Sequence, residues 1–327
     1  MKRILVTGGF GFIGSNFIDD VISKAEVTVL DDLSSGLLGN VSQQMNNPRF
    51  RFVRGSVLDH DKIEEALEGV DAVVHLAAVV SVARSREDPY LVHRVNVEGT
   101  LNVLEACLKH SIDKLIFASS AAVYGNELRF PSEEELGSNP SNLYGATKAA
   151  GEAYVRAYNQ THGLKTVILR LMNVYGPRRS PGPYAGVMAQ FAEAIRLGKP
   201  LTVYGDGEQT RDFVYVSDVT DAMASVLRND RAIGHTFNIG TGSPSTINML
   251  ATIFSKMRKP NSPIHHEPPR PGEVRASCAN IEKARKVLGY SPKVSLKQGI
   301  QLFMDWRKSE QGKILEKSIE NESPSSI

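Results

Sequence analysis

The chain has 327 residues, of which 41% are hydrophobic and 23% are charged. A chain of this length can bury a large core and exceeds the usual size of one domain, so we expect two lobes. The net charge is only +2, and no dense Lys/Arg run is interleaved with aromatic residues, so the sequence excludes a typical nucleic-acid surface as a partner site.

The positions of the cysteines and the hydropathy of the chain argue against a metal site and against a membrane span. Cys107 and Cys278 lie far apart and form no metal-type spacing, and Cys107 falls in an apolar helical stretch. We therefore expect reduced thiols and no metal site. Residues 1–7 lead directly into a strand, and no apolar stretch approaches the roughly 20 residues that span a bilayer. The expected location is cytoplasmic, without a membrane partner.

The first half of the chain alternates short apolar runs with longer amphipathic ones, which is typical of parallel strands joined by crossover helices. The predicted strands are Arg3–Val6, Val27–Leu30, Phe50–Arg54, Ala72–His75, Lys114–Ala118 and Thr166–Leu169. The predicted helices are Phe12–Ser23, Lys62–Leu67, Pro89–Lys109 and Leu143–Thr161. This order predicts an α/β fold with a Rossmann-type, doubly wound parallel sheet.

After about residue 172 the alternation of predicted strands and helices becomes less regular, and turn-forming residues become more frequent. We assign residues 1–172 to the first lobe and residues 173–307 to a smaller α/β lobe that binds substrate. The strand-then-helix pattern at 212–230 is compatible with a return to the first lobe. Residues 308–327 are polar and rich in Ser, Glu and Lys, which is typical of a tail.

Glycines at positions 8, 11 and 14 follow the first apolar strand and precede a helix. This arrangement fits a dinucleotide site, because glycines allow a tight turn, close approach of the pyrophosphate and packing of the helix on the strand. The start of the helix, with Phe12 and Ile13, offers backbone amides and a positive dipole end to phosphates.

Acidic residues close the second strand at Asp31 and Asp32, where a carboxylate can bind the ribose hydroxyls of adenosine. An acid there repels a phosphorylated ribose, so NAD is favoured over NADP. Asp59 is a candidate adenine contact, and a helix N-cap is the competing interpretation. His75 is interpreted as a packed residue, and Leu76 and Ala77 after it permit close approach of the cofactor.

Tyr144 and Lys148 are four residues apart, so they share one face of the predicted helix. A nearby cation favours the phenolate, which makes the pair a candidate base near neutral pH. Ser119 and Ser120 directly follow a predicted strand. Ligands bind beyond the carboxyl ends of strands in such sheets, so we expect these two segments to converge.

The glycines, Asp31, Asn96, the Ser119-Ser120 pair and Tyr144-x-x-x-Lys148 together resemble the extended short-chain dehydrogenase/reductase superfamily, specifically its nucleotide-sugar epimerases and dehydratases. Matches in the second lobe strengthen the resemblance, which covers roughly residues 2–305. They are Arg170-Leu-Met-Asn173-Val-Tyr-Gly-Pro-Arg178, Gly207-Glu-Gln-Thr-Arg211-Asp-Phe-Val-Tyr215-Val, Phe237-Asn-Ile-Gly-Thr-Gly242 and Arg270-Pro-Gly-Glu273.

The resemblance implies roles for the catalytic residues. Tyr144 would be the base, Lys148 would bind the nicotinamide ribose and lower the pKa of the phenol, and Ser120 would hydrogen-bond the reacting sugar hydroxyl. Ser119 competes for that last role, and Ser120 is preferred because it directly precedes Ala-Ala-Val-Tyr. Asn96 is expected at the cofactor.

The residues before Val123-Tyr124 separate the subfamilies. Sugar 4,6-dehydratases carry an Asp-Glu pair there, because elimination of water needs an acid and a base. Nucleotide-glucuronate decarboxylases keep a Glu at the second position, and this chain has Ala121 and Ala122 at the two positions. A transient 4-keto sugar that regains its hydride on the other face is then expected, which is 4-epimerisation of a UDP-hexose such as UDP-glucose or UDP-galactose.

The resemblance also implies the substrate residues of the second lobe. Arg211 and Arg270 suit the diphosphate, with an amide from Asn173. Glu273 is expected at the ribose, and Tyr215 is either a substrate contact or core. A small residue at Ser277 leaves room for an N-acetyl group.

Other functions stay open, both other enzyme activities and a non-enzymatic role. They are an epimerase of UDP-glucuronate or another nucleotide sugar, a keto-sugar reductase, and a non-catalytic NAD-binding sensor. The resemblance further implies a homodimer through the helices predicted at Pro89–Lys109 and Leu143–Thr161. Packing on the sheet explains the apolar faces of those helices equally well.

Overall fold

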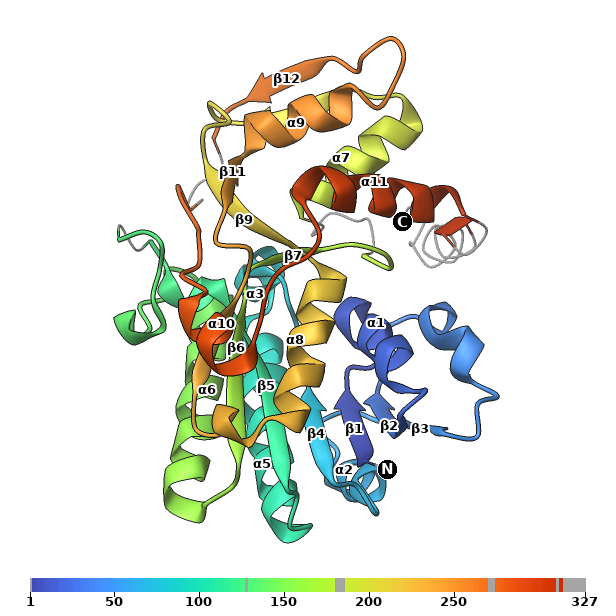
Figure 1. Cartoon of the computed structure of the whole chain (residues 1–327), viewed down its shortest axis with the longest axis vertical. Coiled ribbons are helices and arrows are strands. Elements are labelled where there is room, and N and C mark those ends of the chain that lie inside the picture. The colour runs from blue at the N-terminus through green and yellow to red at the C-terminus, as the bar shows by residue number, and fades with distance from the viewer. Residues whose placement is uncertain (1, 127–128, 180–185, 270–273, 310–311, 314–327) are drawn as a thin grey trace.

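A computed structural model of the chain describes residues 2–126, 129–179, 186–269, 274–309 and 312–313. Seven strands form one large sheet in the order β10-β6-β5-β4-β1-β2-β3, and every neighbouring pair is parallel (Figure 1). These strands are β1 (Lys2–Thr7), β2 (Ala25–Asp31), β3 (Phe50–Arg54), β4 (Ala72–His75), β5 (Lys114–Ser120), β6 (Thr166–Leu171) and β10 (Thr236–Ile239). The predicted Rossmann-type sheet is confirmed.

Helices cover both faces of this sheet. The helices in and around this lobe are α1 (Phe12–Val21), α2 (His60–Leu67), α3 (Val82–Glu87), α4 (Pro89–His93), α5 (Gly99–Lys109), α6 (Leu143–His162), α8 (Val216–Arg228) and α10 (Glu282–Leu288). Alternate strand residues face opposite cores: Ile4 and Val6 pack on the side of α1 and α8, and Leu5 packs on the side of α2, α5 and α6. Period-two alternation in a sheet buried on both faces explains the continuous apolar strands.

The large sheet draws on distant parts of the chain. α8 packs against α1 in the first core, in line with the return that the sequence suggests for 212–230. β10 pairs with β6 at the sheet edge. The predicted range 173–307 of the second lobe therefore contains a strand of the large sheet.

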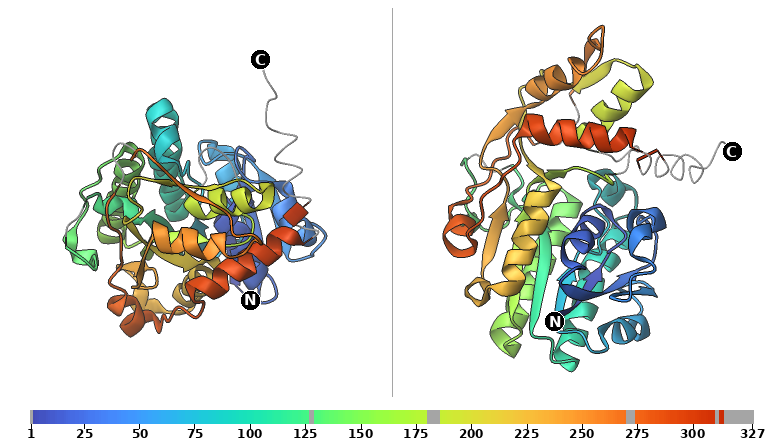
Figure 2. Two further views of the ribbon diagram at one scale, coloured as in Figure 1. Left: turned by 90° about the horizontal axis from the view of Figure 1, so that it is seen from above. Right: turned by 45° about the vertical axis from the view of Figure 1, so that its right-hand side comes forward.

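A smaller lobe stands above the carboxyl ends of the large sheet (Figure 2). It has a three-stranded sheet, β11-β9-β7, and a parallel pair, β12-β8. Its elements are β7 (Asn173–Tyr175), α7 (Val187–Leu197), β8 (Leu201–Tyr204), β9 (Thr210–Tyr215), β11 (Pro244–Thr246), α9 (Ile247–Ser255), β12 (Ile264–Glu267) and α11 (Leu296–Lys308). A third core, with Phe191, Phe254 and Phe303, holds these helices on the strands.

Two features of these elements go beyond the sequence prediction and bear on the site. β5 includes Ser119 and Ser120, because its parallel pairing with β6 continues to the pairs Ser119–Arg170 and Ser120–Leu171. The helix predicted at Pro89–Lys109 is confirmed with these bounds, and a π-helical segment at Arg94–Glu98 lies between α4 and α5 without interrupting the helical backbone. Such π segments are often found at functional sites, and this one contains Asn96.

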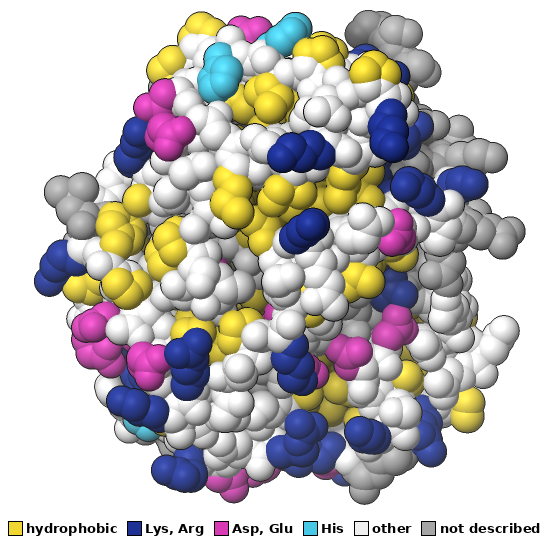
Figure 3. Space-filling model, turned by 45° about the horizontal axis from the view of Figure 1, so that its top comes forward, with side chains coloured by type: hydrophobic (Ala, Val, Ile, Leu, Met, Phe, Trp, Pro, Cys, Tyr) yellow, Lys and Arg dark blue, Asp and Glu magenta, His cyan; other side chains and the backbone are white. Residues whose placement is uncertain are grey.

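No helix among the described residues is both long and apolar enough to cross a membrane. On the face in Figure 3, Lys and Arg side chains are interspersed with acidic, polar and apolar ones. The described part of this face therefore lacks a continuous basic patch.

Candidate active site

The glycine-rich turn between β1 and α1 is built by close backbone contacts. Gly8 has a φ of 70°, and a Cβ on it would lie 2.8 Å from the backbone nitrogen of Ala77. A Cβ on Gly14 would lie 2.5 Å from the carbonyl oxygen of Gly8. α1 begins at Phe12 after Gly11, which has no side chain to cap the helix. Its first amides therefore remain available to an anion, and the turn fits a dinucleotide pyrophosphate.

The acidic residues at this edge have distinct local roles. Asp31 is buried at the end of β2, and its carboxylate accepts hydrogen bonds from the amides of Phe10 (2.9 Å) and Leu33 (2.8 Å). Burial raises the pKa of Asp31, and these two bonds act against that rise. Asp32 accepts from the amide of Ser34, and Asp59 is the N-cap of α2, bonding the amide of Lys62. The N-cap interpretation of Asp59 is thus confirmed, and a contact with adenine stays a prediction.

A neutral chain of hydrogen bonds starts at His75. Its Nε2 lies 3.0 Å from the hydroxyl of Thr100, which itself donates to the carbonyl of Asn96 at 2.7 Å. The Thr100 hydroxyl must then accept from Nε2–H, so Nδ1 is unprotonated and accepts from the hydroxyl of Thr7 at 2.7 Å. Burial lowers the pKa of His75 to about 3, which keeps this single tautomer neutral.

The Thr7 hydroxyl joins this chain to the predicted cofactor residues. It accepts hydrogen bonds from the backbone amides of Leu76 and Ala77, both at 3.2 Å. The amide of Leu76 also bonds the carbonyl of Thr7. His75 therefore fixes, through Thr7, the backbone that lies against Gly8. The interpretation of His75 as a packed residue is confirmed, with this positioning role added.

Asn96 continues the chain toward the helix that carries Tyr144. Its side-chain oxygen accepts from the amide of Val79, and its NH2 group donates to the carbonyl of Val79 and to the hydroxyl of Thr147. Thr147 in turn donates to the carbonyl of Tyr144 at 2.8 Å. Both amide hydrogens of Asn96 are used, and the residue is 1% exposed. Asn96 is thus a buried brace between Val79 and the helix of Tyr144, and its contact with the cofactor stays a prediction.

Tyr144 and Ser120 converge at the carboxyl edge of the sheet. The side chain of Ser120 lowers the pKa of the Tyr144 phenol, while Ser119 donates to Glu152 at 2.6 Å and faces the core. Asn142 caps α6 through the amide of Gly145. The structure therefore favours Ser120 over Ser119 as the hydroxyl at the reaction site.

Lys148 lies one turn further along α6 and is 4% exposed. Its ammonium donates to the carbonyl of Ala118 at 2.9 Å and stands 5.0 Å from the ring centroid of Phe117. Burial lowers the pKa of Lys148 to about 8, and Glu152 acts against that shift. Burial also raises the pKa of Tyr144, whereas the Ser120 hydrogen bond and the positive charge of Arg179 lower it.

A charged cluster supports α6 from the core side. Glu152 accepts two hydrogen bonds from Arg170, at 2.8 and 2.9 Å, and one from Arg156 at 2.9 Å. Arg170 also donates to the carbonyl of Glu134 and stacks on Tyr124, with its guanidinium carbon 4.7 Å from the ring centroid. Hydrogen bonds from Arg170 hold the pKa of Glu152 below its usual value although burial acts in the opposite direction. The cluster ties α6 to β5 and β6.

The second lobe brings some predicted substrate residues toward this edge. Asn173 on β7 pairs with Phe213 on β9, the strand that carries Arg211. The hydroxyl of Ser277 lies 3.9 Å from the sulfur of Met172, the residue between β6 and Asn173. Arg270 and Glu273 lie outside the described residues.

Tyr215 is placed in the core rather than at the site. It is buried, and its ring centroid lies 5.5 Å from that of Tyr175 in the third core. Burial raises its pKa to about 12. The core interpretation that the sequence leaves open is therefore the one that the structure supports.

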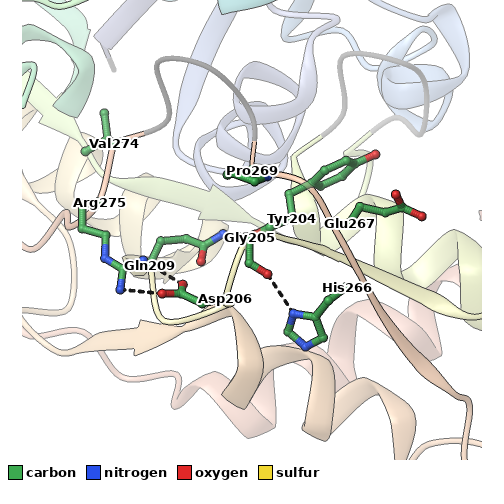
Figure 4. Close-up of a pocket in the computed structure, with 9 residues that line it drawn as sticks. All are labelled: Tyr204, Gly205, Asp206, Gln209, His266, Glu267, Pro269, Val274 and Arg275. Carbon is green, nitrogen blue, oxygen red and sulfur yellow. Dashed lines mark hydrogen bonds and ion pairs between the residues drawn. The ribbon is translucent and has the colours of Figure 1, made fainter.

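A cavity of about 550 Å³ opens beside this region of the second lobe (Figure 4). Its lining residues are Tyr204, Gly205, Asp206, Gln209, His266, Glu267, Pro269, Val274 and Arg275. Arg275 pairs with Asp206 through two contacts, of 2.7 and 2.9 Å, and this ion pair lowers the pKa of Asp206 to about 2. The side-chain oxygen of Gln209 is buried with no hydrogen-bond partner among the described residues. The sequence marks Gly205-Asp-Gly207 only as a turn, so most of this lining is missed.

The sequence of the chain matches a known family over most of its length. A sequence model described as the NAD dependent epimerase/dehydratase family matches residues 4–240. The chain belongs to this family. It is an enzyme of the epimerase class with NAD as its cofactor, and the glycine turn and Asp31 described above fit that dinucleotide.

Individual proteins of the family are similar along nearly the whole chain. A putative UDP-glucose 4-epimerase of Methanocaldococcus jannaschii is 39% identical, over 94% of this chain and 98% of that protein. The structure of a UDP-glucose 4-epimerase of Thermotoga maritima with UDP-glucose is 37% identical, with a TM-score of 0.88, and covers 94% of this chain and 98% of its own. A UDP-N-acetylglucosamine 4-epimerase of Methanobrevibacter ruminantium, in complex with UDP-N-acetylmuramic acid, has a TM-score of 0.90 at 34% identity, covering 94% and 99%.

Proposed function

We propose that this enzyme interconverts UDP-glucose and UDP-galactose, and also their N-acetylated forms, through a transient 4-keto sugar. The observation that carries the proposal is the Ser120–Tyr144 pair followed by two alanines. Ala121 and Ala122 begin the short helix Ala121–Tyr124 directly after β5, and a Cβ on Gly145, next to Tyr144, would lie 2.5 Å from the carbonyl oxygen of Ala122. These positions offer neither acid nor base, so the keto sugar has no partner for elimination of water.

The residues of the site perform the proton transfers of this reaction. Ser120 orients the C4 hydroxyl of the sugar, and the ionised phenol of Tyr144 takes its proton. NAD, when bound, supplies the hydride acceptor and donor. Tyr144 returns the proton to the oxygen at C4 once the sugar presents its other face. Lys148, held by Ala118 and Phe117, is positioned to bind the ribose next to the nicotinamide.

The second lobe is proposed to hold the nucleotide. Arg211 and Asn173 lie on adjacent strands, and Arg270 is expected to complete the diphosphate site with Glu273 at the ribose. The 550 Å³ cavity beside Arg275 has the size to accept a nucleoside, and its lining combines apolar and polar side chains.

The decisive test is the conversion of substrate by the purified holoenzyme. UDP-glucose is incubated with the enzyme, and UDP-galactose is resolved as the product without net consumption of NAD. Tyr144→Phe, which keeps the ring and loses the hydroxyl, should abolish turnover. Absence of the 4-epimer from the wild-type reaction would sink the proposal. Epimerisation of UDP-glucuronate alone, or stoichiometric oxidation of NADH, would establish one of the alternatives in its place.

Ser277 is proposed to admit the N-acetyl group. It is small, half-buried and next to Met172, which follows the strand paired with Ser120. Ser277→Tyr should depress turnover of UDP-N-acetylglucosamine by at least about tenfold relative to UDP-glucose, because the ring fills the space for the acetyl group. Ser277→Ala is the matched control and should leave the ratio of the two rates unchanged. Equal losses on both sugars after Ser277→Tyr would remove the steric argument.

A homodimer through α4 and α6 is also proposed. Tyr90 on α4 and Tyr154 on α6 are exposed, 82% and 40% respectively, although both are large aromatic residues. Sedimentation of the wild type and of Tyr154→Glu tests this surface. A wild-type monomer at micromolar concentration would exclude the dimer.

A further inference from the structure

Residues 274–280, the crossing segment, carry Ser277 from the second lobe to the first without forming a helix or a strand of their own. On one side the segment is bonded to β9. There the amide of Thr210 donates to the carbonyl of Arg275 at 3.0 Å, and its carbonyl accepts from the amide of Ser277 at 3.2 Å. On the other side, Ala279 forms a backbone bridge with Ser132, in the loop that precedes α6. Ser277 therefore lies where the segment passes from one lobe to the other.

A buried carboxylate on β9 holds the same segment. Asp212 is 0% exposed, and its Oδ1 accepts from the amide and the hydroxyl of Thr241, at 2.8 and 2.6 Å. Its Oδ2 accepts from the amide of Gly242 at 3.0 Å and from the amide of Ala279 at 3.2 Å. Thr241 and Gly242 lie between β10 of the large sheet and β11 of the small sheet. The carboxylate thus joins the two sheets to the crossing segment.

The other neighbour of Ser277 is held at the same place. The Ser277 hydroxyl lies 3.9 Å from the sulfur of Met172, whose amide donates to the carbonyl of Ile239 at 2.9 Å. A Cβ on Gly240 would lie 2.6 Å from Oδ2 of Asp212 and 2.7 Å from Cγ of Met172. The absence of a side chain at Gly240 therefore lets Met172 and the carboxylate pack against the same backbone. The wall beside Ser277, made of Met172 and the crossing segment, depends on this contact.

A second buried carboxylate offers a comparison elsewhere in the molecule. Asp218 is 2% exposed and accepts from the amides of Lys293 and Val294, at 2.9 and 3.3 Å. These amides belong to the segment that leads into α11. Both aspartates fix a stretch of backbone without regular structure, but only the stretch held by Asp212 contains Ser277. Substitution of each in turn separates the loss of a buried acceptor from the loss of the wall.

We propose that Asp212 is a positioning residue that holds the wall beside Ser277, and thereby sets the preference of the enzyme for N-acetylated hexoses. The inference rests on the proposed function, in which Ser277 faces the group at C2 of the sugar. An N-acetyl group reaches the wall, whereas the shorter hydroxyl does not. Displacement of the wall should weaken binding of the N-acetylated sugar in either direction, by blocking the group or by losing contact with it.

The first test is calorimetric titration of the NAD-loaded enzyme with UDP-glucose and with UDP-N-acetylglucosamine. In Asp212→Asn an NH2 group replaces one acceptor oxygen and faces a backbone N–H group. The Kd for the N-acetylated sugar should rise about fivefold more than the Kd for UDP-glucose, which corresponds to one lost hydrogen bond. Asp218→Asn is the matched control. It should lower the free energy of unfolding and leave the ratio of the two Kd values unchanged.

A milder variant keeps the test available if Asp212→Asn does not fold. Thr241→Val removes the hydroxyl donor and keeps the carboxylate with its three backbone amides. The ratio of the two Kd values should shift in the same direction by about twofold, because one of four hydrogen bonds is lost. An unchanged ratio in folded Thr241→Val and Asp212→Asn proteins would refute the positioning role.

The second test separates kcat from KM. In Asp212→Asn the KM for UDP-N-acetylglucosamine should rise, while kcat for UDP-glucose should stay near the wild-type value. Equal changes on both sugars, the same change of ratio in Asp218→Asn, or a wild-type enzyme that does not bind the N-acetylated sugar would overturn the inference. If binding changes selectively but the wild type forms no 4-epimer, the proposed function fails and the role of Asp212 stands.

Discussion

Two buried polar systems hold α6, and they differ in charge. One is the neutral chain from Thr7 through His75, Thr100 and Asn96 to Thr147. The other is the ionic cluster of Glu152 with Arg170, Arg156 and Ser119. The neutral chain ends at the backbone of the cofactor site, whereas the ionic cluster ends on the sheet. Hydrogen bonds suffice to orient a backbone, but a buried charge is costly once its buried ion-pair partner is removed.

The largest expected effect is in the ionic cluster. Glu152→Ala removes the carboxylate and leaves the 2%-exposed Arg170 without its acid, so the free energy of unfolding should fall by about 4 kcal/mol. Urea unfolding measures the change. Arg156→Ala, which removes a partner that is 39% exposed, should cost less than about 1 kcal/mol. Similar losses in the two variants would contradict the view that burial decides the cost.

The neutral chain should respond less strongly in stability and more in cofactor binding. His75→Leu keeps a similar volume but leaves the Thr7 donor and the Thr100 acceptor without their partner, at a cost of about 2–3 kcal/mol. NAD affinity should fall as well, because Thr7 no longer fixes Leu76 and Ala77. Calorimetric titration with NAD measures this second effect. Unchanged NAD affinity in the folded variant would separate His75 from the cofactor site.

Lowering the pH should reduce the contribution of the neutral hydrogen-bonded chain to the free energy of unfolding. The pKa of His75 is about 3 in the folded protein, because burial disfavours the charged ring, against an ordinary value of 6.5, so the unfolded chain binds the proton more readily. Stability contributed by neutral His75 is present above pH 6.5 and is lost as the pH falls, by about 2 kcal/mol at pH 5. Urea unfolding across this range measures the slope. His75→Leu should show a smaller slope, and identical slopes would refute the assignment.

The smallest expected effect is at Thr147, the last residue of the neutral chain of hydrogen bonds. Thr147→Val is nearly isosteric and removes the hydroxyl between Asn96 and the carbonyl of Tyr144, so about 1 kcal/mol should be lost. The rate should fall through kcat more than through KM, because Tyr144 loses a hydrogen bond that positions it, whereas no contact with the substrate is removed. Thr161→Val, an exposed threonine on the same helix, is the control. A loss confined to KM would argue against positioning through Thr147.

Much of the fold follows from local patterns. Period-two apolar runs predict the large sheet, and β3 and β4 match their predicted bounds. The π-helical segment at Arg94–Glu98 inside the long predicted helix is not predictable in this way, because the residues there have ordinary helical character. The segment is accompanied by the tertiary hydrogen bonds of Asn96 to Val79 and Thr147.

The sequence by itself determined the family of chemistry. The glycines after β1, Asp31, and Tyr144 four residues before Lys148 follow from steric and charge rules that act over a few residues. Tertiary structure decided which serine faces the core and that Asn96 braces Val79 against the helix of Tyr144. These two outcomes depend on contacts between residues far apart in the chain, and sequence spacing does not encode such distances.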